Sequence, residues 1–180
     1  MREMKGDRVI SISLRDAGAG NRRGETMALM LVQHGKSLPK EVDPQRGLSE
    51  EGRLEVKQMA ALARDHRVDV AQIYHSGKKR ARQSAEIFAA ALDPQGGIIE
   101  TKGLDPLDDV QAFANDGIKP DDNVMIVGHL PFLESLTSYL ITGSVDYHVF
   151  RFQNAGIICL EYDGEKNSWT IKWTLMPHIG

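Results

Sequence analysis

The sequence contains a single cysteine, Cys159, which excludes an internal disulfide bond and a cysteine-based metal site. Cys159 lies in an apolar run, so we expect its side chain to be buried. The net charge of −3 provides no basic excess for a nucleic-acid-binding face. No stretch approaches the ~20 apolar residues that cross a bilayer, and the N-terminus lacks the apolar segment of a signal peptide. We therefore expect a soluble, cytoplasmic protein that binds neither nucleic acid nor membrane.

The length of 180 residues suits one domain with a substantial core. We assign that domain to residues 27–180, because residues 1–26 are poorly patterned and contain a glycine-rich stretch typical of a linker. Within this N-terminal segment, residues 8–14 alternate with a period of two. The segment is an extra edge strand, a flexible tail or an extension upstream of a start at Met27, and these alternatives stay open.

Strand-like and helix-like patterns alternate from residue 27 onward. Strands are predicted at 27–33, 70–75, 96–101 and 124–127, and helices at 49–64, 79–92, 110–115 and 131–140. Residues 156–162 and 169–175 predict an antiparallel hairpin with its turn at 163–164. The expected core face of the first helix consists of Leu54, Met59, Leu62 and the nearby alanines, and that of the second consists of Ala81, Ala85, Ile87, Phe88 and Leu92. This order predicts the α/β class, a three-layer α/β/α domain with a mostly parallel central sheet.

Two predicted strands each end in a histidine. His34 follows the first strand and is succeeded by Gly35, which lets the chain turn sharply beside the ring; His129 follows the strand at 124–127. Because open α/β sheets bind ligands at the carboxyl ends of their strands, we expect the two rings to meet there. A neutral imidazole can attack phosphorus, and a protonated one can stabilise phosphoryl oxygens.

Two arginines are candidates for binding the same anion. Arg80 lies in the first turn of a predicted helix, where its guanidinium and the helix N–H groups suit phosphate. Arg46 lies in a loop ahead of a helix. The neighbouring Lys78, Lys79 and Arg82 are expected to be solvated surface charges. Metal binding is the competing interpretation of paired histidines, but no third ligand stands at metal spacing and the arginines would repel a cation.

These motifs resemble those of the histidine phosphatase superfamily, with its phosphoglycerate mutase-like fold, and particularly its small SixA-like phosphohistidine phosphatases. The resemblance spans about residues 28–177 and rests on motifs in family order: Leu31–Gly35, Asp43 with Arg46 and Leu48–Gly52, Ser76–Ala85, Gly128–Pro131, Leu140–Gly143 and Trp169–Pro177. It implies a catalytic set of His34 as nucleophile with Arg80 and His129. It also implies substrate contacts at Gln33, Arg46, Gly35 and Lys36, and neither metal nor cofactor.

Gln33 departs from the family pattern, which has an arginine at this position. Glutamine can donate a hydrogen bond but brings no charge, so the change should cost about 2–4 kcal/mol of transition-state stabilisation if nothing compensates. Lys36, where relatives often carry an acidic residue, is the candidate compensating cation.

The candidate general acids are Asp108 and Asp109, with Asp105 beside them. Loop aspartates also cap helices, so a structural role stays open. Imidazole leaves more readily than an alkoxide, and a weak acid therefore favours P–N substrates. The predicted function is a metal-independent phosphatase acting on a phosphohistidine protein. The alternatives are a small-molecule phosphomonoesterase and a non-catalytic module that binds phosphate or a phosphoprotein. The oligomeric state is not predicted.

Overall fold

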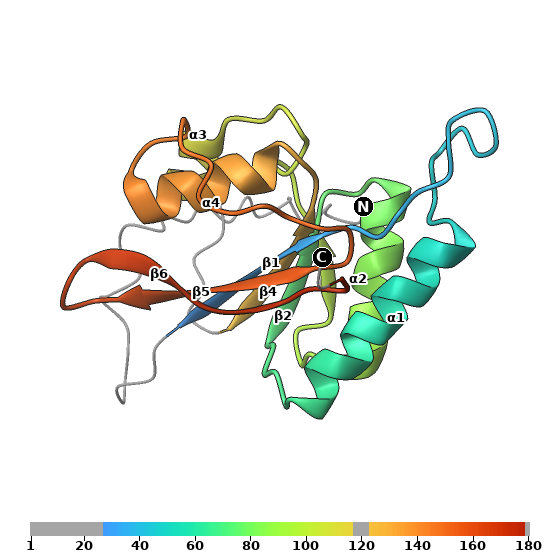
Figure 1. Cartoon of the computed structure of the whole chain (residues 1–180), viewed down its shortest axis with the longest axis horizontal. Helices are drawn as coiled ribbons and strands as arrows, with labels where there is room; N and C mark the ends of the chain where they lie inside the picture. Colours follow the sequence, from blue (N-terminus) through green and yellow to red (C-terminus); the bar gives the residue numbers. More distant parts are fainter. Residues whose placement is uncertain (1–26, 117–122, 179–180) are drawn as a thin grey trace, which may run out of the picture.

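The computed structural model describes residues 27–116 and 123–178, so the predictions for residues 1–26 lie outside the described residues. The described residues form six strands and four helices that alternate along most of the chain (Figure 1). In chain order these are β1 (Ala28–Gln33), α1 (Glu50–Asp65), β2 (Gln72–His75), α2 (Lys79–Leu92), β3 (Ile98–Glu100), α3 (Val110–Asp116), β4 (Val124–Gly128), α4 (Phe132–Thr142), β5 (Ile157–Asp163) and β6 (Ser168–Leu175).

The strands form one mixed sheet with the order β3-β2-β4-β1-β5-β6. Strands β1 to β4 pair in parallel, and the hairpin of β5 and β6 adds two antiparallel strands beside β1. The predicted α/β fold with a mostly parallel sheet is therefore confirmed. In the register of β1 and β4, Gln33 lies opposite Gly128, so both strands end at the same edge.

The helices cover the sheet on both faces, as the alternation of side chains along β1 requires. Leu29 and Leu31 pack into the cluster with α3 and α4, whereas Met30 and Val32 pack into the cluster with α1 and α2. Figure 1 shows α3 and α4 on one side of the sheet and α1 and α2 on the other. No helix within residues 27–116 and 123–178 is long and apolar enough to cross a membrane.

The buried face of α1 differs from the predicted one. The Ser49 hydroxyl caps the helix by accepting a hydrogen bond from the amide of Gly52, as expected. However, Leu54 and Leu62 are exposed, and the buried residues are Gly52, Val56, Met59, Ala60 and Ala63. The last four follow the i, i+3, i+4, i+7 spacing of one helix face. Met59 and the alanines near it are therefore buried as predicted, whereas the two leucines lie outside this face.

Two smaller expectations also change. In α2, Ala81, Ala85 and Phe88 are buried as predicted, but Ile87 and Leu92 are only partly buried against the same cluster. The hairpin turn lies between Asp163, the last residue of β5, and Ser168, the first residue of β6, so it begins one residue later than predicted. The carboxylate of Asp163 accepts hydrogen bonds from the backbone amides of Glu165 and Lys166 in this turn. Cys159 is buried as predicted, and burial raises the pKa of its thiol to about 12.

Candidate active site

The two predicted histidines lie together at the carboxyl ends of neighbouring strands. His34 follows β1 and His129 follows β4, and the amide of His34 donates to the carbonyl of Gly128 at 3.1 Å. Their ring centroids are 4.8 Å apart. The parallel pairing of β1 with β4 therefore brings together side chains that are far apart in the sequence.

The ring of His34 is held by a different contact at each nitrogen. Nδ1 lies 2.7 Å from the carbonyl oxygen of Gly35, and because a carbonyl only accepts, Nδ1 must carry the hydrogen. Nε2 then has a lone pair, which accepts a hydrogen bond from Nε of Arg80 at 3.0 Å. This orientation presents Nε2 as a nucleophile beside a cation.

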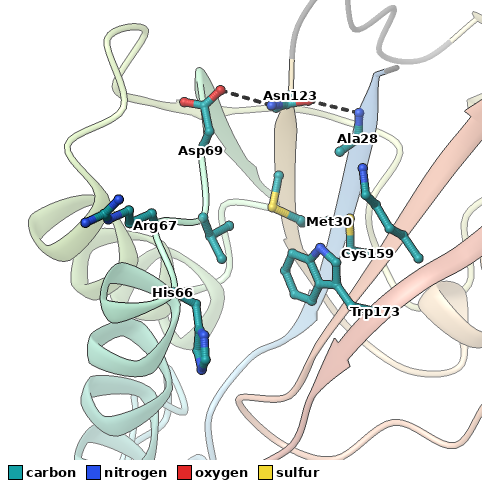
Figure 2. Close-up of a pocket in the computed structure, with 10 residues that line it drawn as sticks. Ala28, Met30, His66, Arg67, Asp69, Asn123, Cys159 and Trp173 are labelled. Carbon is teal, nitrogen blue, oxygen red and sulfur yellow. Dashed lines mark hydrogen bonds between the residues drawn. The ribbon is translucent and has the colours of Figure 1, made fainter. Parts of the chain in front are cut away.

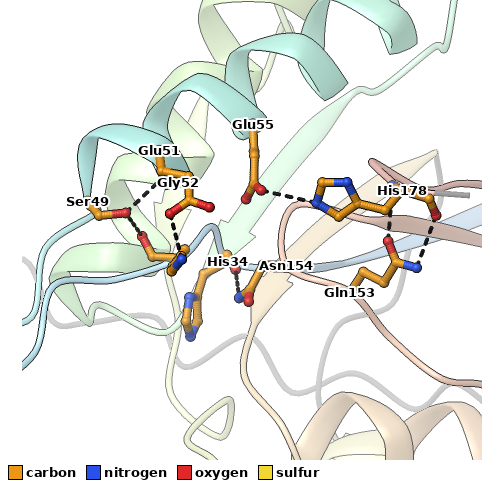
Figure 3. Close-up of polar contacts among 9 residues, drawn as sticks. His34, Ser49, Glu51, Gly52, Glu55, Gln153, Asn154 and His178 are labelled. Atoms are coloured by element: carbon orange, nitrogen blue, oxygen red, sulfur yellow. Dashed lines mark hydrogen bonds and ion pairs between the residues drawn. The ribbon is translucent and has the colours of Figure 1, made fainter. Parts of the chain in front are cut away.

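The backbone behind His34 is held by the loop that precedes β5. The side-chain amide of Asn154 donates to the carbonyl of His34 at 2.8 Å (Figure 3). Gln153 exchanges two hydrogen bonds with the backbone of His178, whose ring also contacts Glu55 of α1 at 3.2 Å. Residues near the chain end thus connect this loop to α1 and support the position of His34.

The pKa of His34 is lowered from 6.5 to about 4, mainly by burial and further by the charges of Arg80 and Arg46. The ring is therefore neutral, and able to act as a nucleophile, down to about pH 4. In an NMR titration of the folded protein we expect the His34 ring to protonate near pH 4. In Arg80→Gln the midpoint should rise but stay below 6.5, because burial is the larger cause. A wild-type midpoint near 6.5 would contradict this description of the site.

Arg80 is positioned by a relay from α2 to the loop after β1. The hydroxyl of the buried Ser84 donates to the carbonyl of Arg80 at 2.8 Å and accepts from the amide of Gly35 at 3.1 Å. Burial and the charge of Arg46 lower the pKa of the Arg80 guanidinium, although an arginine stays protonated at neutral pH. Arg80 therefore brings a partly desolvated positive charge against His34.

Arg46 is held near the histidines by a structured loop. Its backbone has a φ of +52°, a conformation that non-glycine residues rarely adopt, and its guanidinium donates to the Ser37 hydroxyl at 3.3 Å. Asp43 organises this loop by accepting hydrogen bonds from the amides of Gln45 and Gly47. Lys79 binds the same carboxylate at 2.8 Å, so it forms an ion pair instead of being the solvated charge we predicted.

Gly35 is required for space. Gly35 is not one of the described glycines with a positive φ, so a sharp turn does not explain why this position is occupied by glycine. A Cβ at this position would lie 2.6 Å from the side chain of Val56 and 2.8 Å from the carbonyl oxygen of Gly52. The loop after β1 therefore packs directly against the start of α1.

We expect Gly35→Ala to lower the free energy of unfolding by about 1–3 kcal/mol, because the added methyl group overpacks this contact. Urea denaturation measures the effect. Gly164→Ala is the matched control, since a Cβ at that turn meets only one atom, at 3.9 Å, and its stability should change by less than about 0.5 kcal/mol. Equal stability of Gly35→Ala and the wild type would refute the packing argument.

His129 is 1% exposed, and its pKa is lowered to about 3, mainly by burial, followed by the nearby His34 and the charges of Arg80, Lys78 and Arg46. With these protein groups alone, the lowered pKa favours a neutral ring at pH 7, whereas the sequence led us to expect a protonated donor. A phosphate dianion against the ring would act in the opposite direction. Nε2 lies 2.6 Å from the hydroxyl of Ser76, and Nδ1 is buried without a partner among the described residues.

The structure separates the roles expected for Gln33 and Lys36. Gln33 is half-buried at the end of β1, and its Oε1 is buried without a hydrogen-bond partner in the described part of the chain. Lys36 is exposed and contacts Glu51 at 2.5 Å. By contrast, Lys78, which we expected to be solvated, contributes its charge to the environment of His129. Of these two lysines, Lys78 is the one whose charge acts on a histidine of the site.

Both acid candidates make local contacts with the backbone. Asp108 accepts from the amide of Asp105, and Asp109 accepts from the amides of Gln111 and Ala112 at the start of α3. These contacts correspond to the capping alternative. Asp105 instead pairs with Lys78 at 2.8 Å, and its charge acts on Arg80. Of the three aspartates, Asp105 is therefore the one whose described contacts lead to the histidine site, through Lys78 and Arg80.

The sequence patterns did not indicate several residues that hold this site: Ser76, Lys78, Ser84 and Asn154. The serines are part of the Ser76–Ala85 motif, so their position relative to Arg80 was the available signal. For Asn154 the sequence contained no such signal, because only the folded chain brings this residue next to His34. Within residues 27–116 and 123–178, no group of three or more His, Cys, Asp or Glu side chains is arranged to hold a metal ion.

A separate cavity of about 210 Å³ lies at the amino ends of the strands (Figure 2). Asn123 lies there between Ala28 and Asp69, accepting from the amide of Ala28 and donating to the carboxylate of Asp69. The lining also includes Trp173 and Lys172, but none of the predicted site residues. The histidine site is thus at the opposite end of β1 from this cavity.

Known structures share this fold. The chain superimposes on the protein histidine phosphatase SixA, solved with tungstate, with a TM-score of 0.69, 25% identity, and coverage of 84% of this chain and 97% of SixA. For a mycobacterial glucosyl-3-phosphoglycerate phosphatase, the TM-score is 0.63 and the identity 15%, and the match covers 82% of this chain and 98% of that protein. For a phosphoserine phosphatase from Entamoeba histolytica, the TM-score is 0.59 and the identity 14%, and the match covers 82% of this chain and 96% of that protein. At 14–15% identity, the similarity to the last two proteins shows a shared fold only.

Sequence comparison gives the family. No curated protein sequence matches the chain, but the pattern of the histidine phosphatase superfamily (branch 1) matches residues 22–111. That stretch contains His34, Arg46 and Arg80, and the family and its structural neighbours support phosphatase activity. The chain belongs to the histidine phosphatase superfamily.

Proposed function

We propose that this protein dephosphorylates phosphohistidine in a protein substrate, without a metal ion, through a phosphohistidine formed on His34. Nε2 of His34 attacks phosphorus as the bond from phosphorus to the leaving imidazole nitrogen breaks. Water then attacks phosphorus, the bond to Nε2 breaks, and inorganic phosphate leaves. Arg80 moves its hydrogen bond from Nε2 to a phosphoryl oxygen, while Arg46 and His129 stabilise the remaining charge.

The observation that carries this proposal is the orientation of His34. Its Nδ1 is bound to the carbonyl of Gly35, which leaves the lone pair of Nε2 beside Arg80. The lowered pKa keeps that nitrogen unprotonated at neutral pH. A nucleophile of this kind with adjoining cations suits in-line attack on a phosphoryl group.

Two considerations favour a P–N substrate over a phosphate ester. Asp108 and Asp109 bind backbone amides near α3, and an alkoxide would need an acid to leave, whereas imidazole needs less help. The neighbour SixA, at 25% identity, is a protein histidine phosphatase. Both support phosphohistidine as the substrate class.

The proposal is tested by measuring release of phosphate from a phosphohistidine protein and from p-nitrophenyl phosphate, each with and without EDTA. We expect faster hydrolysis of the phosphohistidine protein, unchanged by EDTA. Faster hydrolysis of p-nitrophenyl phosphate would indicate a small-molecule phosphomonoesterase instead. Loss of activity with EDTA, restored by a divalent metal, would contradict the metal-independent mechanism.

Gln33 supports a second candidate, a module that binds a phosphorylated partner without turnover. The half-buried amide cannot provide the charge that arginine provides in relatives, and its Oε1 has no described partner. Binding of inorganic phosphate without hydrolysis of either substrate would favour this candidate over the enzyme.

If the protein is an active phosphatase, Gln33→Arg should raise kcat/KM about 10- to 100-fold, because it adds a charge-assisted contact to the transition state. Initial rates on the phosphohistidine protein provide the measurement. Lys36→Ala is the companion variant and should leave kcat/KM within about twofold, because Lys36 is exposed and contacts Glu51. A large loss in Lys36→Ala would restore that lysine as the compensating cation.

A further inference from the structure

Ser76 makes the closest described contact with the second histidine of the site. It follows β2, the strand on the other side of β4 from β1, and its Oγ lies 2.6 Å from Nε2 of His129. The other ring nitrogen, Nδ1, is buried and without a partner among the described residues, on a ring 4.8 Å from that of His34. Nε2 therefore has a hydrogen-bond partner in the described structure, whereas Nδ1 has none.

A neutral imidazole has a hydrogen on only one of its two ring nitrogens, so the contact of Nε2 with Ser76 determines whether Nδ1 is a hydrogen-bond donor or an acceptor. If the hydroxyl donates to Nε2, the ring hydrogen is on Nδ1, which becomes a donor. If Nε2 donates to the hydroxyl, Nδ1 carries a lone pair and would repel a phosphoryl oxygen. Since the positive charges of Lys78, Arg80 and Arg46 all act on the ring, the site suits an anion, and an anion needs a donor.

We propose that Ser76 is a positioning residue whose hydroxyl donates to Nε2 of His129, fixing the tautomer in which Nδ1 carries the hydrogen and donates to a phosphoryl oxygen while the ring is neutral. The tautomer is a property of the folded protein alone; its use on a phosphoryl group rests on the proposed function. The arrangement explains how a buried histidine surrounded by His34 and three cations still provides a donor at pH 7.

The tautomer is measured by NMR on the full chain labelled with ¹⁵N-histidine, at pH 7 and without substrate. We expect the signals of His129 in the wild type to show a protonated Nδ1 and an unprotonated Nε2, and those of Ser76→Ala to show a mixture. A hydrogen on Nε2 in the wild type would overturn the proposal. This measurement does not depend on activity, so it remains decisive even if no substrate is hydrolysed.

Kinetics test the consequence of the tautomer. In Ser76→Ala, kcat/KM for the phosphohistidine protein should fall about 10- to 100-fold, as when groups that orient metal-binding histidines are removed. Ser76→Thr keeps the hydroxyl and should recover most of the rate.

Ser135→Ala, a serine of α4 outside the site, is the control and should match the wild type. Wild-type kcat/KM in Ser76→Ala would overturn the role of the hydroxyl even if the tautomer is as expected. No activity in the wild type would instead count against the proposed function, and the NMR result would then decide the tautomer by itself.

Discussion

His34→Ala is expected to reduce the rate of phosphate release by at least about 1,000-fold, because the variant has no atom that can accept the phosphoryl group. The ring nitrogen Nε2 is oriented toward this task by the contact of Nδ1 with Gly35, and no other described side chain repeats that geometry. Initial rates on a phosphohistidine protein measure the effect, with circular dichroism to verify that the variant is folded.

His148→Ala is the matched control for this variant. His148 is exposed in the segment before β5, so its loss should leave the rate within about twofold of the wild type. If His34→Ala keeps a tenth or more of the wild-type rate, the nucleophile is another group and the proposed mechanism is wrong.

Arg80→Ala should lower kcat/KM by about 100- to 1,000-fold, which corresponds to the loss of about 2.7–4 kcal/mol of transition-state stabilisation. Its Nε is 3.0 Å from the nucleophilic nitrogen, and burial of the guanidinium strengthens its interaction with a phosphoryl oxygen. Arg80→Lys keeps the charge but not the planar pair of donors, so we expect an intermediate rate. Steady-state kinetics on the phosphohistidine protein separate the three proteins.

Arg82→Ala provides a control two residues further along α2. Its guanidinium is exposed and lies 3.6 Å from Glu86 on the helix surface, an ion pair that contributes little to stability. We expect its kinetics to match the wild type. Equal losses in Arg80→Ala and Arg82→Ala would mean that general positive charge, and not the contact with His34, supports the reaction.

The fold could be predicted from the sequence wherever a pattern was long and local. The apolar runs of β1 and β4 and the alternation of strands and helices were sufficient for the α/β class. On α1, Met59 and the nearby alanines are buried as predicted, but Leu54 and Leu62 are exposed, because their positions lie beside the buried face. Burial there is decided by packing against α2 and the sheet, which no local pattern records.

The candidate site divides in the same way. His34 and His129 were predictable because strand ends are visible in the sequence, whereas Arg80 was distinguished from the neighbouring cations only by its position in the family motif. The structure brings all three together. The contacts of Ser76 with His129 and of Asn154 with His34 join segments 53 and 120 residues apart, and such pairs are set only by the fold. The ion pair of Lys36 with Glu51, at the start of α1, is likewise set only by the fold.

The most direct test of the account is to trap the phosphorylated enzyme. The wild-type protein is mixed with a phosphohistidine protein labelled with ³²P on its phosphoryl group, quenched in base within milliseconds, and digested for mass spectrometry. We predict a transient, base-stable and acid-labile phosphoryl group on His34 that decays as inorganic phosphate appears. Release of phosphate without any labelled enzyme, or a label on another residue, would contradict covalent catalysis by His34.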